Sequence, residues 1–367
     1  MTNKTNGGES YTYSLGRLYR GFGYSRYKMS KFEEYDTYVQ NKDFLISDRV
    51  ITFTDVSGKL LAMKPDVTIS IIKNTEDTNK GVRKMYYKEN VYRVSDGSHG
   101  FKEIMQTGLE CIGDIDTYSI SEVIMLACKS LEMASDEYVL DISHMGFVSG
   151  LLAEAGFNHS EKNAVLCAIG EKNLPELKAL CAKKELSKDL EDKITGLVNI
   201  YGKATDVICK LKEISVNAET QKALEELTLM CDVFKNTTAA DKISIDFSVV
   251  NDMNYYNGIV FRGYIEGIPT GVLSGGQYDK LMEKMGKSSK AVGFAIYLDL
   301  LEMLDTTAAE FDTDVLVIYN DSTSPEKVYA LAEKYTNDGK TVLCVKNAPG
   351  NIRCKETICL NGEGDIA

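Results

Sequence analysis

Polar side chains interrupt several apolar stretches of this 367-residue chain, at positions where they could contact a small ligand. The stretch DFSVVNDMNYYNGIVFRGY, residues 246–264, is rich in β-branched and aromatic residues and is predicted to be a strand. Two adjacent tyrosines, Tyr255 and Tyr256, lie in it. Tyrosine hydroxyls donate and accept hydrogen bonds, so this predicted strand has unusual capacity to bind a polar group.

Other polar residues lie in or beside further predicted strands. They are Asp66, Thr68, Arg93, Gln106, Glu110 and Tyr278. Gln106 and Glu110 are four residues apart, which places both side chains on the same face of a strand. Carboxylates can bind an ammonium group and a guanidinium can bind a carboxylate, so this set suits a zwitterionic ligand. Taken singly, each residue is better explained as an ordinary solvated strand residue.

Several other chemistries are not expected. The stretch SGGQY, residues 274–278, lacks the GxGxxG spacing of a dinucleotide site. The nine cysteines are scattered without a CxxC pair, so we expect free thiols in a reducing compartment and neither a metal site nor a cofactor. His144, in DISHMGF, is predicted to be a packed residue at the end of a strand.

Composition and charge narrow the partners. The chain is 44% hydrophobic and 26% charged, with a net charge of -12, so we expect a globular protein that does not bind nucleic acid. The sequence contains no run of eighteen apolar residues, so we expect no membrane-spanning helix. The N-terminal stretch is polar and lacks the apolar core of a signal peptide, so a cytoplasmic location is expected.

The order of predicted elements indicates an α+β fold. Strands predominate in residues 1–146 and return in 241–305, whereas Leu, Ala, Lys and Glu recur at helical spacing in 147–240. We predict one split domain with an antiparallel sheet flanked by helices, a helical insertion over 147–240, and a small α/β unit over 312–367. Locally, residues 24–38 are predicted to be extended, 49–68 to be a hairpin, and a helix to begin with Ser119 as its N-cap.

Five ordered motifs resemble those of histidyl-tRNA synthetase and its paralogues. They are LLAMKPDVT (60–68), YYKENVYRV (86–94) followed by KEIMQTGLECIG (102–113), NDMNYYNGIVFRGY (251–264), LSGGQYDKLMEKMG (273–286) and AVGFAI (291–296). The resemblance covers about residues 10–305. It implies the class II synthetase fold, which has a six-stranded antiparallel sheet with helices and is usually dimeric.

The resemblance also implies a histidine pocket. The family's pocket positions match Asp66, Thr68, Arg93, Gln106, Glu110, Tyr255, Tyr256 and Tyr278. By this match, Gln106 and the tyrosines would hydrogen-bond the imidazole and its surroundings. Glu110 and Asp66 would face the ammonium group or the ring nitrogens. Whether histidine would bind in this pocket or at a subunit interface stays open.

The residues that would bind ATP depart from the family pattern. Leu300 stands where the family has an arginine that binds ATP, and a leucine cannot bind a phosphate. Further departures are Ser30 for a proline, Ser95 for a glutamate, Asn251 for an arginine and Asn254 for an aspartate, and a loop SDGSHG (95–100) without arginines. Because synthetases depend on charge around the triphosphate, aminoacylation is not expected.

A paralogue that keeps the amino-acid pocket but loses the ATP site resembles the regulatory subunits of ATP phosphoribosyltransferase. That family associates with a short catalytic subunit, and the complex joins ATP and phosphoribosyl pyrophosphate in the first step of histidine biosynthesis. The resemblance implies a non-catalytic subunit of a hetero-oligomer that self-associates as a dimer and responds to histidine. The alternatives are an active histidyl-tRNA synthetase and a stand-alone histidine-sensing module.

Overall fold

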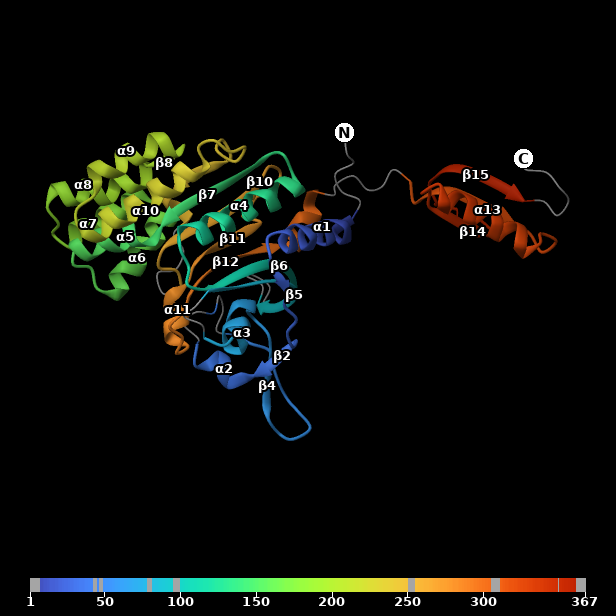
Figure 1. Ribbon diagram of the computed structural model, residues 1–367, viewed down its shortest axis with the longest axis horizontal. Coiled ribbons are helices and arrows are strands. Elements are labelled where there is room, and N and C mark those ends of the chain that lie inside the picture. The colour runs from blue at the N-terminus through green and yellow to red at the C-terminus, as the bar shows by residue number, and fades with distance from the viewer. Residues whose placement is uncertain are drawn as a thin grey trace. The chain divides into compact units, whose positions relative to one another are not determined.

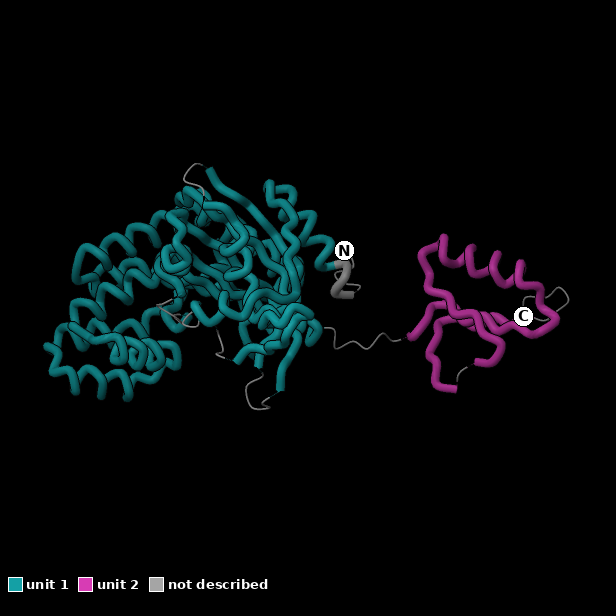
Figure 2. Tube along the Cα trace, turned by 90° about the horizontal axis from the view of Figure 1, so that it is seen from below, with its two compact units in different colours: residues 1–304 teal, residues 305–367 magenta. Residues whose placement is uncertain are grey.

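The computed structural model describes residues 7–41, 45, 49–77, 81–94, 100–249, 255–304, 311–348 and 350–360. The chain divides into two compact units, residues 1–304 and 305–367, which Figure 2 shows in different colours. Over the described ranges, no helix is both long and apolar enough to cross a bilayer.

A nine-stranded sheet forms the centre of the first unit (Figure 1). Its six central strands pair antiparallel with one another, in the order β5 (Val82–Val94), β6 (Phe101–Gly113), β12 (Lys290–Tyr297), β11 (Leu273–Gln277), β10 (Ile259–Ile265) and β7 (Tyr138–His144). Short strands extend both edges: β1 (Ser25–Arg26) beside β5, and β9 (Ile243–Asp246) and β8 (Tyr201–Gly202) beyond β7. The predicted antiparallel sheet is therefore confirmed.

One face of this sheet packs against two helices, α1 (Gly7–Gly21) and α4 (Thr117–Ala134). A row of residues in register across β6, β12, β10 and β7 supplies its apolar surface: Leu109, Phe294, Phe261 and Ile142. Gly275 of β11 lies in the same row between the two phenylalanines. A Cβ atom at position 275 would lie 2.5 Å from Phe294 Cβ and 2.7 Å from Phe261 Cε2, so the row closes only around a glycine.

The opposite face of the sheet carries small residues at its centre. The neighbouring row in register runs through Gly108, Ala295 and Ser274, on β6, β12 and β11. Helix α3 (Val67–Asn74) and helix α11 (Asp279–Lys284) belong to a second apolar cluster, which also contains Tyr87 of β5. Small side chains between these bulkier elements leave space above the sheet.

A three-stranded antiparallel sheet lies beside α3, in the order β2 (Phe32–Glu34), β4 (Leu60–Met63) and β3 (Thr52–Thr54). The predicted hairpin over 49–68 is confirmed by β3 and β4. The prediction that residues 24–38 are extended is partly wrong, because Tyr35–Val39 form helix α2. Tyr35 and Tyr38 lie three residues apart, so a helix turns both toward the second apolar cluster, and this packing overrides their strand preference.

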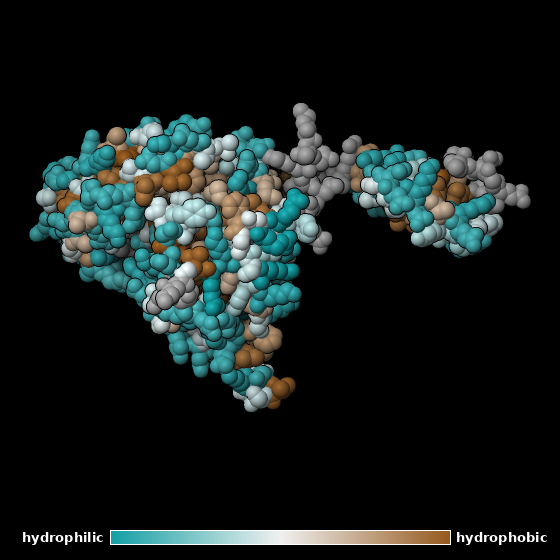
Figure 3. All heavy atoms as spheres, viewed as in Figure 1, coloured by the Kyte–Doolittle hydropathy of each residue, from teal (hydrophilic) through white to brown (hydrophobic). Residues whose placement is uncertain are grey.

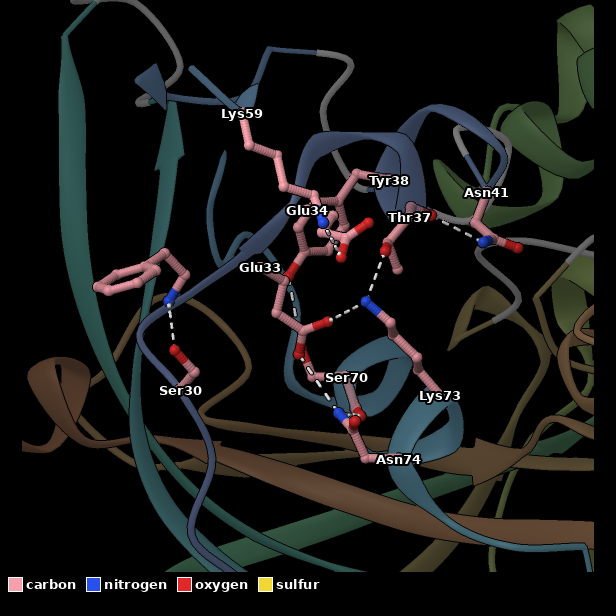
Figure 4. A network of polar contacts seen from close by, with 11 residues as sticks. Ser30, Glu33, Glu34, Thr37, Tyr38, Asn41, Lys59, Ser70, Lys73 and Asn74 are labelled. Atoms are coloured by element: carbon pink, nitrogen blue, oxygen red, sulfur yellow. Dashed lines mark hydrogen bonds and ion pairs between the residues drawn. The ribbon is translucent and has the colours of Figure 1, made fainter. Parts of the chain in front are cut away.

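Polar contacts fasten α3 to β2 and α2, as Figure 4 shows. Lys73 Nζ donates to Glu33 Oε2 at 3.1 Å and to Thr37 Oγ1 at 2.8 Å. Asn74 Nδ2 donates to Ser70 O at 2.8 Å. The Glu33 side chain is only 8% exposed, so its bond to Lys73 is better shielded than a surface ion pair. These contacts fix the helix whose first turn faces the space above the sheet.

Helices dominate the segment between β7 and β9. They are α5 (Met145–Glu154), α6 (His159–Gly170), α7 (Leu174–Lys183), α8 (Lys188–Gly196), α9 (Ala204–Ile214) and α10 (Ala218–Phe234), with a short 3-10 turn (Leu197–Asn199) and β8 between α8 and α9. His144 ends β7, is 4% exposed, and places Nε2 2.8 Å from Glu226 Oε2 of α10. It is therefore packed at a strand end, as predicted.

The start of α4 differs from the sequence-based expectation. Its N-cap is Asp116, whose Oδ1 accepts from the Ser119 backbone N–H at 2.8 Å, so the prediction of Ser119 as the cap is wrong. Aspartate and serine cap helices about equally well, and a carboxylate at this terminus also interacts favourably with the helix dipole. The N-cap therefore lies three residues earlier than predicted.

The second unit is a small parallel α/β structure. Strand β13 (Thr313–Tyr319) lies between β14 (Val342–Val345) and β15 (Cys354–Leu360), and helix α13 (Pro325–Asn337) connects β13 to β14. Val315, Val317 and Ile358 form its buried centre, against which Leu331 and Tyr335 of α13 pack. The strand and helix texture predicted for 312–367 is present.

We expect Gly275→Ala to lower the free energy of unfolding by about 1–3 kcal/mol, the usual effect of adding a methyl group to a packed core. Urea unfolding followed by circular dichroism measures it. Gly196→Ala is the matched control, since position 196 has helical dihedrals and nothing within 4 Å of the added atom. Equal midpoints for the two variants would contradict the packing described for the Phe261 and Phe294 row.

Candidate functional site

A cavity of about 290 Å³ lies on the small-residue face of the sheet. All of the predicted site residues line it: Asp66, Thr68, Arg93, Gln106, Glu110, Tyr255, Tyr256 and Tyr278. They come from α3, β5, β6, the segment before β10, and the turn after β11. The volume is at the lower end of the range of about 300–1,000 Å³ for small-molecule sites, so it suits a ligand of amino-acid size.

Glu110 is the most buried charged group of the cavity, with 2% of the residue exposed. Its Oε1 accepts from Thr68 Oγ1 at 2.9 Å and its Oε2 accepts from the Tyr278 hydroxyl at 2.5 Å. The side chain lies across β12, where a Cβ atom at Gly293 would come within 1.8 Å of Oε2. Only glycine at position 293 allows this carboxyl group to reach Tyr278.

Burial raises the pKa of Glu110 to about 8, although the hydrogen bonds from Tyr278 and Thr68 lower it in part. The nearby charge of Asp66 raises it further. Around neutral pH the cavity therefore contains a carboxyl group that is mostly protonated. A ligand that offers a positive charge or an N–H group would stabilise the ionised form, so binding and proton exchange are coupled here.

Asp66 and Arg93 contact each other at the N-terminus of α3. Asp66 Oδ1 accepts from the Ile69 backbone N–H at 2.9 Å and so serves as the N-cap of α3. Arg93 Nε donates to Pro65 O at 2.8 Å, and its Nη2 lies 3.5 Å from Asp66 Oδ2. Both side chains thus have a structural role in addition to lining the cavity, which the sequence did not predict.

The two adjacent tyrosines do not lie in a strand, so that prediction is wrong. Tyr255 and Tyr256 precede β10, which begins at Ile259. Gln277 Oε1 accepts from the Ile259 backbone N–H at 2.8 Å, and Asn257 bonds with Asp279 at 3.0 Å. The Gln277 side chain thus accepts from a backbone N–H of β10, while the Asn257 backbone N–H still bonds Gln277 O at 3.1 Å. The regular strand begins only after the two tyrosines.

The two tyrosines form one aromatic wall of the cavity. The ring centroids of Tyr255 and Tyr256 are 4.6 Å apart, and those of Tyr255 and Tyr278 are 6.0 Å apart. Burial raises the pKa of all three hydroxyls, so each stays neutral and can donate a hydrogen bond. Gln106 and Glu110 share one face of β6, as their spacing predicts, opposite Tyr297 and Gly293 of β12.

Sequence reasoning missed several residues that also line the cavity. They include Leu45, Tyr87, Arg262, Ser274 and Tyr297. Arg262 and Ser274 are directly opposite each other on β10 and β11. If the pairing of these strands had been known, either residue would have pointed to the other as a neighbour on the same face. No pattern in the sequence singles out Arg262, because a lone basic residue in a strand is most often solvated.

Leu300 lies outside this cavity, in helix α12 (Leu298–Leu301), where it packs partly buried against the main apolar core. Its position therefore supplies apolar packing and not charge. Ser30 accepts from the Phe32 backbone N–H through Oγ at 3.3 Å. Positions 95, 251 and 254, and most of the loop 95–100, are outside the described residues.

Comparison with known proteins identifies the family. The family model described as histidyl-tRNA synthetase matches residues 4–301. The chain belongs to the histidyl-tRNA synthetase family. This membership agrees with the antiparallel sheet of six central strands and with the cavity on one of its faces.

Two proteins similar to this chain are named as regulatory subunits of ATP phosphoribosyltransferase. An ATP phosphoribosyltransferase regulatory subunit from Ruminiclostridium cellulolyticum is 28% identical over 87% of this chain and 78% of its own length. A solved structure from Bacillus halodurans, described as an ATP phosphoribosyltransferase regulatory subunit/histidyl-tRNA synthetase, is 22% identical with a TM-score of 0.80, over 99% of this chain and 97% of that one.

The ATP phosphoribosyl transferase (HisG:HisZ) complex from Thermotoga maritima also contains a similar chain. The two are 20% identical with a TM-score of 0.62, over 79% of this chain and 97% of that chain. At these identities the solved structures establish the fold alone. They confirm the predicted class II synthetase-like architecture.

The raised pKa of Glu110 makes stability depend on pH. Because its folded-state pKa is about 8 and its ordinary value is 4.5, the folded protein holds a proton that the unfolded chain releases between these values. The free energy of unfolding therefore falls as pH rises toward 8, by at most about 1.4 kcal/mol per unit. We expect Glu110→Gln to flatten this dependence between pH 6.5 and 8.

Urea unfolding at several pH values in this window measures the effect. The window lies above the pKa of Asp141, which burial raises to about 6, so that group contributes little. Glu103→Gln, an exposed change on the same strand, is the control and should keep the wild-type slope. Parallel pH profiles for wild type and Glu110→Gln would show that Glu110 is ionised in the empty cavity.

Proposed function

We propose that this chain is a non-catalytic regulatory subunit of ATP phosphoribosyltransferase. It assembles with a short catalytic subunit, is required for the activity of that subunit, and responds to histidine, the end product of the pathway. The regulatory subunit from Ruminiclostridium cellulolyticum and the HisG:HisZ complex from Thermotoga maritima support the assembly. Histidine binding, dimer formation and a cytoplasmic location are parts of the proposal that rest on the cavity and on family resemblance.

The observation that carries the proposal is the contrast between two sites. The eight residues that match the family's amino-acid pocket line one cavity, whereas Leu300, where the resemblance implies an ATP-binding arginine, packs against the apolar core. A triphosphate requires fixed positive charge, because its transfer chemistry develops charge on the phosphate oxygens. A protein with this arrangement binds an amino acid without activating it.

Histidine suits the chemistry of the cavity. Its imidazole N–H can donate to Glu110, which lies between Thr68 and Tyr278 and is poised to ionise near neutral pH. Its ammonium group can approach Asp66, whose Oδ2 lies 3.5 Å from Arg93 Nη2. An apolar amino acid would leave the buried Glu110 without a donor from the ligand, which is unfavourable once that group is ionised.

Regulation then follows from linkage. If histidine binds one arrangement of the hetero-oligomer more tightly than the other, it shifts the population toward that arrangement, and the state of the catalytic subunit alters histidine affinity by the same factor.

The β2–β4–β3 sheet exposes Phe32, Phe53 and Leu60, which are 46%, 38% and 45% exposed, and Figure 3 shows apolar side chains near the tip of the β3–β4 hairpin. Such exposed apolar residues support self-association.

Reconstitution with a short catalytic subunit tests the proposal. We expect phosphoribosyl-ATP formation to increase when the purified chain is added and to decrease again when histidine is present. Tyr278→Phe, which removes a donor to Glu110, should leave activation intact and weaken inhibition by histidine, roughly 10-fold in the inhibitory concentration. Glu103→Gln should behave as wild type.

Two other outcomes would assign a different function. No change in activity on mixing, together with tight histidine binding, would indicate a stand-alone histidine-sensing module. Histidine-dependent ATP–pyrophosphate exchange would indicate an active histidyl-tRNA synthetase, a function that family membership alone allows. We expect no exchange, because Leu300 offers no group to a phosphate.

A further inference from the structure

Arg262 occupies a place in the cavity that the family resemblance does not assign. It lies on β10, directly opposite Ser274 of β11. Register continues this row through Ala295 of β12 and Gly108 of β6 to Tyr87 of β5. Side chains directly opposite each other in antiparallel strands share a face, so Arg262 belongs to the face that forms the cavity floor.

The aliphatic part of Arg262 is held by close packing. A Cβ atom at Gly271, just before β11, would lie 2.6 Å from both Cγ and Cδ of Arg262 and 3.2 Å from Nε. The glycine therefore lets the arginine side chain lie flat against the backbone of the neighbouring strand. This packing directs the side chain toward the residues that precede β11, and Arg262 lines the cavity together with Ser274. It also limits the freedom of the side chain before any ligand binds.

The other charged groups of the cavity already have protein partners. Arg93 donates to Pro65 O and lies beside Asp66, and Glu110 accepts from Thr68 and Tyr278. Arg262 differs from them: within the described ranges of the chain, its guanidinium has neither a hydrogen bond nor an ion pair. A half-buried group with five N–H donors gains much from an anionic partner.

The carboxyl group nearest in register does not fill this role. Asp141 is directly opposite Arg262 on β7, yet the charges that act on its pKa are those of Asp246 and Lys172, after the effect of burial. Lys172 Nζ in turn bonds Asp246 Oδ2 at 2.7 Å. These groups lie on the side of Arg262 away from β11, whereas its packing against Gly271 is on the β11 side.

We propose that Arg262 binds the carboxylate group of the amino acid in the cavity. The ligand then lies with its carboxylate toward Ser274 and Arg262 and its hydrogen-bond donors toward Glu110, at two separate parts of the floor. Arg262 thereby provides from β10 a guanidinium that the chain lacks at position 251, where the family pattern has an arginine and this sequence has asparagine. This inference rests on the proposed function for the identity of the ligand.

Calorimetric titration with histidine and histidinol tests the assignment, because histidinol has a hydroxymethyl group in place of the carboxylate. We expect the wild type to prefer histidine. Arg262→Gln should weaken histidine binding by roughly 10- to 100-fold, the effect of losing a charge-assisted hydrogen bond, and leave histidinol binding within about 3-fold. Arg262→Lys, which retains the charge without the planar group, should give an intermediate histidine affinity.

Arg83→Gln is the matched control, since Arg83 lies on β5 outside the cavity and pairs with Glu76 at the surface. Unchanged histidine affinity in Arg262→Gln would overturn the assignment. Equal losses for histidine and histidinol would also overturn it, because they would show that Arg262 only maintains the shape of the cavity.

A separate outcome concerns the ligand. If histidine does not bind the wild type, the histidine part of the proposed function fails, and thermal-shift titrations with the other amino acids and their decarboxylated amines decide the role of Arg262. An amino acid that stabilises the wild type more than its amine does, and that loses this advantage in Arg262→Gln, would support carboxylate binding. If no amino acid behaves in this way, the proposal that Arg262 binds a carboxylate is overturned.

Discussion

The position of one buried carboxyl group determines much of this structure. Glu110 reaches across β12 to Tyr278 because Gly293 has no side chain, and it also accepts from Thr68 on α3. These two hydrogen bonds connect the sheet to the first turn of α3 on one side and to the start of α11 on the other. The cavity exists because these contacts hold the two helices above a floor of small residues.

The two faces of the same strands have opposite properties because side chains alternate along a strand. On β6, Leu109 faces the core while Gly108 and Glu110 face the cavity, and on β12 Phe294 faces the core while Gly293 and Ala295 face the cavity. One face is thus filled by large apolar side chains and the other is left open. A shift of one residue in the register of β6 and β12 would exchange the two faces and destroy both the core and the site.

The sequence was most informative where local pattern and tertiary structure agree. The spacing of Gln106 and Glu110 predicted their common face, and the sequence over 49–68 predicted the β3–β4 hairpin. Prediction failed where side chains replaced backbone hydrogen bonds. The Gln277 side chain accepts from the Ile259 backbone N–H, the regular strand begins only after Tyr255 and Tyr256, and no propensity scale contains that competition. Helix α2 was missed for a different reason, since the burial of Tyr38 depends on a cluster assembled from distant segments.

Arg262 illustrates a further limit of reading a sequence alone. Its role depends on two facts that register and packing supply: the cavity lies on its face of β10, and Gly271 directs its side chain. Leu300, where the family resemblance implies an ATP-binding arginine, packs partly buried against the apolar core, while Arg262 lines the cavity. On the proposed function, an apolar side chain thus stands at a position that the resemblance assigns to ATP binding, and a guanidinium is available to the carboxylate of a bound amino acid. Under the proposed function, that redistribution favours binding of an amino acid as a signal over its activation for transfer.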